Sequence, residues 1–104
     1  MHTASDILTF KSGYMGTSNG VYAGLVKSIA FKITPSAQLS KGVAYVVATL
    51  SSSFKPNIGV GSMAIKGTET VYAEINDSTG EVSVLALTNN IPASTNIWFR
   101  CSYI

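Results

Sequence analysis

The strongest candidates for recognition chemistry are Trp98 and Arg100, the only tryptophan and the only arginine of the chain. They lie in the run 97–103, where successive side chains would point to opposite faces of a strand. Trp98 and Arg100 would therefore share an outward face, on which a flat indole ring and a guanidinium can bind a ligand without covalent chemistry. The opposite face is expected to be core and would carry Ile97, Phe99, Cys101 and Tyr103.

A second pair with the same spacing is Tyr72 and Glu74 in the run 71–75. The alternation places both on one face of a strand, with apolar side chains on the other. Each candidate also has an ordinary structural interpretation. Trp98 could pack at a subunit interface, Tyr72 could be a plain surface residue, and Arg100 could pair with Glu74 as a structural ion pair.

Covalent and metal chemistry find little support in the sequence. The lone Cys101 excludes an internal disulfide and a cysteine-based metal site, and we interpret it as a small buried hydrophobe. The only histidine, His2, is expected to fray at the start of the chain. Glycoside hydrolysis needs two carboxyl groups about 5–10 Å apart, and only Glu74 and Glu81 flank a single hairpin. We therefore expect no enzyme, no metal and no cofactor.

Composition narrows the class of protein further. The 104 residues make one domain, 1–104, and only 12% of them are charged, against roughly 25% in an average domain. The net charge is +2 and the basic residues are scattered, so nucleic-acid binding is disfavoured. No run approaches the ~20 apolar residues of a membrane span. A hydroxyl-rich surface with so few charges fits a secreted module, an exterior virion protein or an oligomer.

Short strands separated by turn residues are predicted along the whole chain, and no segment has the spacing of an amphipathic helix. The expected strands cover 7–10, 25–33, 43–50, 58–66, 71–75, 81–88 and 97–103. The expected connections are 12–20, which is rich in glycine, and 35–42, 54–57 and 76–80. The strand over 58–66 contains two glycines and should be bulged or an edge. This pattern predicts an all-β fold, a small antiparallel β-barrel or sandwich of Greek-key type with about seven strands.

Three segments in order carry a resemblance to a known family. They are Leu-Ser-Ser-Ser-Phe-Lys-Pro at 50–56, the strand–turn–strand at 71–82, and Ile-Pro-Ala-Ser-Thr-Asn-Ile-Trp-Phe-Arg-Cys-Ser-Tyr at 91–103. Over roughly residues 45–104 this order resembles the C-terminal head domain of lactococcal phage receptor-binding proteins of the tail tip or baseplate. In that family the head is a small antiparallel β-barrel that forms a homotrimer and binds saccharides of the host cell envelope.

The resemblance implies a non-enzymatic adhesin that recognises a cell-envelope saccharide of a Gram-positive host. It implies a location in the virion, at the tail tip or baseplate, and a homotrimer. It also implies that the domain is the C-terminal part of a longer chain, with other baseplate proteins bound through the missing N-terminal region. The alternatives are a structural trimerisation domain without a ligand and, further off, a polysaccharide depolymerase.

The family's sugar site combines an aromatic ring with acidic, basic or imidazole groups, which maps here onto Trp98, Arg100, Tyr72 and Glu74. An aromatic face can cover the C–H patch of a pyranose while charged groups hydrogen-bond its hydroxyls. Arg100 could also bind a phosphate of a phosphorylated glycan. This chain differs from the family in lacking a histidine after His2. Any imidazole contact of the family's site must therefore have been replaced here.

Overall fold

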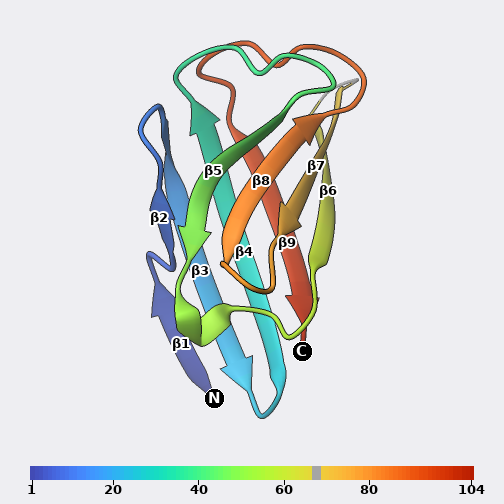
Figure 1. Cartoon of the computed structure of the whole chain (residues 1–104). Helices are drawn as coiled ribbons and strands as arrows, with labels where there is room; N and C mark the ends of the chain where they lie inside the picture. Colours follow the sequence, from blue (N-terminus) through green and yellow to red (C-terminus); the bar gives the residue numbers. More distant parts are fainter. Residues whose placement is uncertain (67–68) are drawn as a thin grey trace.

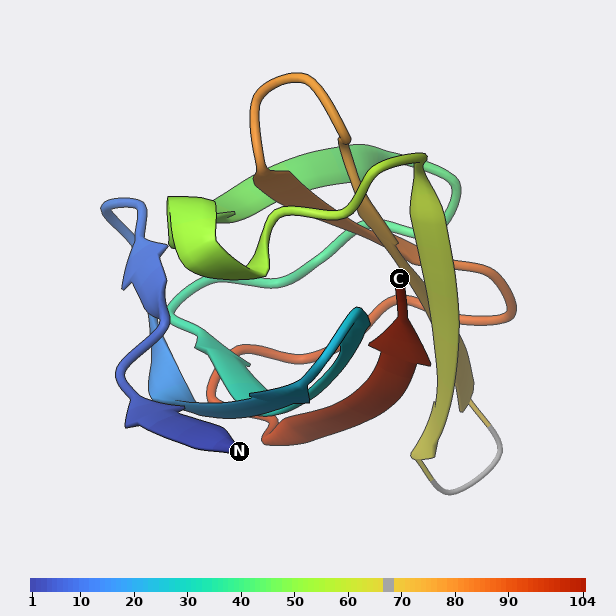
Figure 2. The same cartoon turned by 90° about the horizontal axis from the view of Figure 1, so that it is seen from below.

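Alternating buried and exposed side chains fold the chain into two antiparallel β-sheets packed face to face (Figures 1 and 2). The computed structural model describes residues 1–66 and 69–104. The first sheet has the order β1 (His2–Ser5), β3 (Tyr14–Ala23), β4 (Val26–Pro35) and β9 (Ile97–Tyr103). The second has the order β2 (Leu8–Phe10), β5 (Ala44–Leu50), β8 (Glu81–Ala86), β7 (Glu69–Ile75) and β6 (Val60–Lys66). The described residues thus form nine strands in a sandwich, which confirms the predicted all-β antiparallel class.

The core lies between the sheets and is built from the inward side chains of both. On β4, Ile29, Phe31 and Ile33 are at most 2% exposed. The ring of Phe31 stacks on that of Phe99, its partner across the β4–β9 ladder, with 5.1 Å between ring centroids. The second sheet contributes small and β-branched side chains, which pack well on a pleated surface. Those that are almost fully buried include Val47, Val71, Ala73, Ile75, Val82 and Val84.

Polar groups inside the sandwich have partners. The hydroxyl of Ser18 is buried and accepts a hydrogen bond of 3.0 Å from the backbone N–H of Leu8, where the chain crosses from the first sheet to the second. The phenol of Tyr103 donates to the carbonyl of Phe54 in the single 3-10 turn, Ser52–Phe54. Burial raises the pKa of Tyr103 above its ordinary value, since the phenolate would lose its hydration. The last strand is therefore tied to the turn after β5.

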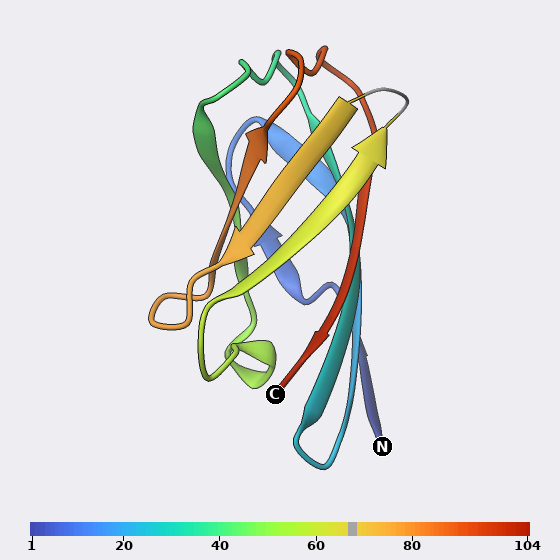
Figure 3. The same cartoon turned by 90° about the vertical axis from the view of Figure 1, so that its right-hand side faces the viewer.

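The edges of the two sheets meet at β6 and β9 (Figures 2 and 3). The hydroxyl of Ser62 donates to the backbone carbonyl of Arg100 at 3.2 Å, which joins the two strands. β6 is an edge strand of the second sheet, which is one of the two alternatives that its glycines predicted. Among the described residues no helix is long and apolar enough to cross a membrane.

The predicted hairpin at 76–80 is confirmed, and its chemistry is local. The Asn76 side-chain oxygen accepts hydrogen bonds from the N–H groups of Ser78 and Thr79, and Gly80 has a φ of +75°. Asparagine favours such turns because its side chain can replace a backbone acceptor.

Two expectations for the N-terminal part are wrong. Residues 12–20 are not a loop, because β3 begins at Tyr14 and pairs with β1 on one side and β4 on the other. His2 is not frayed, since β1 pairs it with Tyr22, on whose ring it stacks at 4.8 Å. These two strands account for the difference from about seven. Gly16 and Gly20 mark close packing rather than a loop, a contact that only the tertiary structure creates, whereas Gly13, with a φ of +92°, lies in the turn before β3.

Gly20 shows why β3 needs a residue without a side chain. A Cβ at this position would lie 2.5 Å from Cε1 of the buried Phe54 ring and 3.0 Å from Cδ1 of Ile7. A methyl group there would force both side chains to move.

We predict that Gly20→Ala lowers the free energy of unfolding by about 1–3 kcal/mol, the usual cost of overpacking. Gly59→Ala is the matched control, because its Cβ would meet only the carbonyl oxygen of Ile75 at 3.8 Å. That variant should stay within about 0.5 kcal/mol of the wild type. Urea unfolding at one protein concentration measures both, and equal stability of the two variants would contradict the proposed packing constraint.

Candidate functional site

Outward side chains of the first sheet form cross-strand rows that bring residues far apart in sequence together. One row contains Ser5, Asn19, Ala30 and Arg100, and a neighbouring row contains Thr17, Lys32 and Trp98. A third row contains Thr3, Val21, Ser28 and Ser102. Directly opposed residues in antiparallel strands share a face. We call these three rows the polar face.

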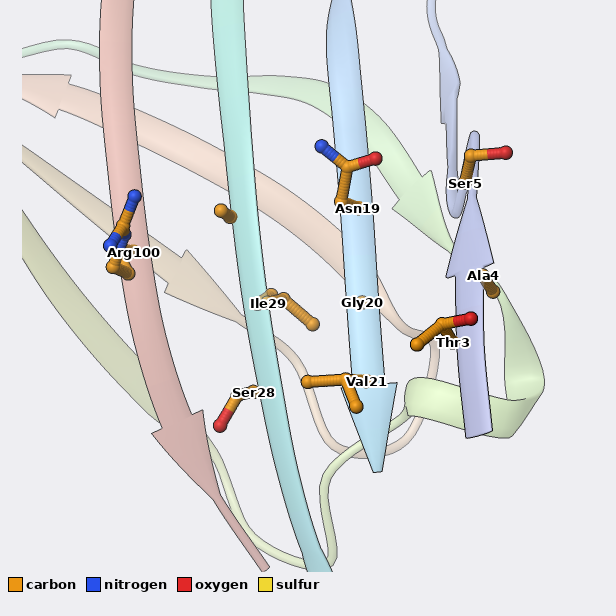
Figure 4. A pocket seen from close by; sticks show the side chains of 10 residues that line it. Thr3, Ala4, Ser5, Asn19, Gly20, Val21, Ser28, Ile29 and Arg100 are labelled. Carbon is orange, nitrogen blue, oxygen red and sulfur yellow. The ribbon is translucent and has the colours of Figure 1, made fainter. Parts of the chain in front are cut away.

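Two adjacent hollows lie on the polar face. The β1 hollow has a volume of about 610 Å³ and is lined from β1 to Arg100, with Thr3, Asn19 and Ser28 among its walls (Figure 4). The tryptophan hollow has a volume of about 350 Å³ and is lined by Trp98 and Arg100, among others. Both hollows are lined by Asn19, Ala30 and Arg100. Ala30 projects only a methyl group between two longer side chains, which leaves the sheet surface open at this point.

Trp98 is exposed over 62% of its surface and is a near neighbour of two cations of the polar face. The Lys32 ammonium is 5.4 Å from the centroid of its ring, a cation–π contact. Arg100 follows two residues later on the same face of β9. All five acidic side chains lie outside the three rows of this face: Asp6, Glu69, Glu74, Asp77 and Glu81. The polar face therefore favours hydroxyl-rich and anionic ligands.

The structure brings Trp98 and Arg100 together, as predicted, and places Tyr72 and Glu74 on the other sheet. Tyr72 lies on the outer face of β7, where its phenol covers Gly61, and Glu74 lies opposite Gly61 on the β6–β7 ladder. Within the described residues the one ion pair joins Lys11 to Glu81 at 3.9 Å, so Glu74 and Arg100 do not form the structural ion pair considered above.

Met63 connects the two regions at the corner of the sandwich. It is the direct partner of Tyr72 across the β6–β7 ladder, and it also lines the tryptophan hollow. Tyr72 is thus one strand away from the hollow of Trp98. The predicted roles of Tyr72 and Glu74 in binding remain predictions.

Sequence reasoning missed most of the polar face. Asn19 and Thr17 lie in the segment predicted as a loop, and Thr3 and Ser5 lie before the first predicted strand, where the sequence indicated no element. The outward position of Lys32 is predictable from the sequence, because alternation over 25–33 places its side chain on the outer face. What the sequence lacked was the register that sets Lys32 directly opposite Trp98.

Reactive groups are not gathered on this face. Cys101 is half-buried on the inward side of β9 and packs against the core, and burial raises the pKa of its thiol. This agrees with the prediction of a small hydrophobe, since a raised pKa disfavours the nucleophilic thiolate. Among the described residues no three side chains of histidine, cysteine, aspartate or glutamate gather in a way that could hold a metal ion.

The arrangement of the sheets defines the class of this fold, a two-layered antiparallel β-sandwich with four strands in one sheet and five in the other. No protein-family model matches the chain, and no curated protein shows significant similarity to it in sequence. Among solved structures, the chain is similar to the head domain of phage bIL170, reported with the question whether receptor-binding domains of lactococcal phages share a common fold. The TM-score is 0.63 at 15% identity, over 97% of this chain and 96% of that one. The resemblance suggested by residues 45–104 is confirmed as a likeness of fold, and it extends over almost the whole domain.

Because Trp98 is the only tryptophan, its fluorescence reports on the polar face alone. We expect iodide to quench it about twofold more strongly than caesium, relative to free N-acetyltryptophanamide, because Lys32 and Arg100 attract anions to the ring. Lys32→Gln should reduce this preference, whereas Lys41→Gln, an exposed lysine outside the polar face, should not. An equal ratio of iodide to caesium quenching for the wild type and for free N-acetyltryptophanamide would contradict a cationic face. Protection of the fluorescence from both ions would place Trp98 inside an interface.

Proposed function

We propose that this domain is a non-enzymatic receptor-binding module of a phage, which attaches the virion to a cell-envelope saccharide of a Gram-positive host. The observation that carries the proposal is the exposed ring of Trp98 beside Arg100 and Lys32, at the rim of a hollow on a face without carboxylates. The likeness to a phage receptor-binding head supports the same role.

The side chains of the tryptophan hollow suit a sugar with an acidic substituent. The indole face covers the C–H groups of a pyranose, and the guanidinium of Arg100 donates paired hydrogen bonds to hydroxyl or phosphate oxygens. Lys32 adds a second positive charge next to the same ring. We assign the principal contacts to Trp98 and Arg100, with Tyr72 and Glu74 reached by a ligand that extends past Met63 around the β6 edge. A phosphorylated envelope glycan matches this chemistry.

The second sheet suggests how the domain assembles. Its outer face carries an apolar row across β5, β8, β7 and β6, in which successive partners are Ala44, Leu85, Tyr72 and Met63. Val46 lies beside this row and is 42% exposed. Exposed apolar surface of this kind marks association sites. Because only 12% of the residues are charged, repulsion between surface charges would oppose self-association only weakly. The domain is proposed to form a homotrimer through the part of this row on β5 and β8, with Val46 beside it, so that Tyr72 and Met63 lie at the border of the interface, within reach of the ligand.

In the proposed setting the homotrimer sits at the tail tip or baseplate and is linked to other baseplate proteins through an N-terminal region of a longer chain. The apolar row also supports the second candidate function, a trimerisation domain that binds no ligand. A depolymerase remains the third, since Glu74 and Glu81 lie on the outer faces of neighbouring strands. Release of reducing ends from host polysaccharide would reveal it.

We predict that Trp98→Ala lowers the affinity for host cells about tenfold per site, since about 1.4 kcal/mol of stacking is lost. Arg100→Ala should weaken binding as well, and more so for a phosphorylated glycan. Thr49→Ala, on the outer face of the second sheet, is the matched control and should bind like the wild type. Adsorption to cells and mass by light scattering are measured on the same samples.

The outcomes separate the candidate functions. Unchanged adsorption of an intact Trp98→Ala oligomer would exclude recognition by the polar face. Loss of the oligomer in that variant would show instead that Trp98 is an interface residue.

A further prediction concerns the apolar row. The wild-type domain should be a trimer at tens of micromolar, and the double variant Val46→Lys, Leu85→Lys should be monomeric, because it would bury two positive charges without partners in the interface. Thr49→Lys adds a charge on the same strand outside the row and should remain a trimer. A wild-type monomer, or an unchanged mass of the folded double variant, would contradict assembly through this row.

A further inference from the structure

The β1 hollow lies next to the tryptophan hollow, and three residues belong to the walls of both. Asn19, Ala30 and Arg100 line each hollow and form one cross-strand row that runs from β3 through β4 to β9. A ligand that rests on Trp98 and passes Arg100 therefore continues into the β1 hollow without leaving the surface of the sheet.

The chemistry of the β1 hollow is also that of a sugar site. Thr3, Ser5, Asn19 and Ser28 line it with hydroxyl- and amide-bearing side chains, and Val21 adds apolar surface (Figure 4). The Ser28 hydroxyl is also hydrogen-bonded to that of Ser102 at 2.7 Å. No hydrogen bond within the described residues engages the side chains of Thr3, Ser5 or Asn19, which leaves their polar groups to a ligand. Apolar surface with a few placed polar groups is the usual composition of small-molecule sites.

The two volumes, about 610 Å³ and about 350 Å³, each fall in the usual range of ligand sites, ~300–1,000 Å³. A single sugar ring on Trp98 would leave the larger hollow unused. The charge distribution adds a constraint on the ligand, because Arg100 stands where the two hollows meet and is the only charged side chain of the β1 hollow.

We infer that the domain binds an extended oligosaccharide rather than a single sugar, with one ring stacked on Trp98, an acidic or hydroxyl-bearing linkage at Arg100, and further units in the β1 hollow. The inference rests on the proposed saccharide recognition and adds its ligand class and a second subsite. It assigns the recognition of oligosaccharide length to β1, because Thr3 and Ser5 of this strand form the wall of the β1 hollow that is farthest from Trp98.

The test uses fragments of the cell-wall polysaccharide of an adsorbing strain, separated by length, with affinities measured by calorimetry. Wild-type affinity should rise about tenfold or more from single sugars to the longer fragments, a gain equal to one step in the logarithm of the dissociation constant. Thr3→Trp fills the β1 hollow and should abolish this gain while leaving the affinity for single sugars unchanged. Trp98→Ala should weaken binding at every length.

Two further variants keep the test decisive. Thr3→Ala with Ser28→Ala removes hydrogen-bonding groups without adding bulk, and should reduce the gain if Thr3→Trp perturbs the fold. Thr49→Trp places the same ring on the second sheet and should retain the full gain. Binding that does not depend on fragment length, or a full gain in folded Thr3→Trp, would overturn the second subsite alone. Absence of binding to fragments of every length would overturn the proposed function together with it.

Discussion

Burial of one side of β4 is the constraint on which the rest of this structure depends. β4 is hydrogen-bonded to β3 on one edge and β9 on the other, and its inward residues Ile29, Phe31 and Ile33 are almost fully enclosed. Because side chains alternate with a period of two, a slip of one residue would move all three into water. The same register sets Lys32 opposite Trp98 and Ala30 opposite Arg100. The polar face is therefore positioned by the core behind it, on rigid strands rather than on loops.

The two outer faces of the sandwich differ in chemistry. The polar face of the first sheet has hydroxyl groups and two cations, and the second sheet has an apolar row and the carboxylates Glu74 and Glu81. Under the proposed function one face recognises the host and the other holds the protomers together. In that proposed assembly, a surface hidden in an oligomer would need few charges, which would account for a charged fraction of only 12%.

Shallow hollows on a sheet surface bring weak binding at each site, since a ligand there stays partly in water and its hydrogen bonds compete with hydration. Multiplicity compensates, because several linked copies convert later contacts into intramolecular ones. An extended ligand acts in the same direction within one protomer, as each added sugar unit contacts a subsite that is already in place. Under the proposed function, both effects would make attachment reversible at first and firm once many sites are occupied.

Local pattern alone determined the all-β class, the inward and outward sides of the last strand, the turn at 76–80 and the edge character of 60–66. These features depend on side-chain alternation and turn chemistry, which a short window of sequence contains. Only the tertiary structure decided that 14–23 is a strand, since Gly20 is explained by the Phe54 ring packed against it. It also decided that Asn19 and Lys32 join Trp98 and Arg100, while Tyr72 and Glu74 lie on the other sheet. Sheet membership and register are set by burial between residues distant in sequence, which a period of two cannot encode.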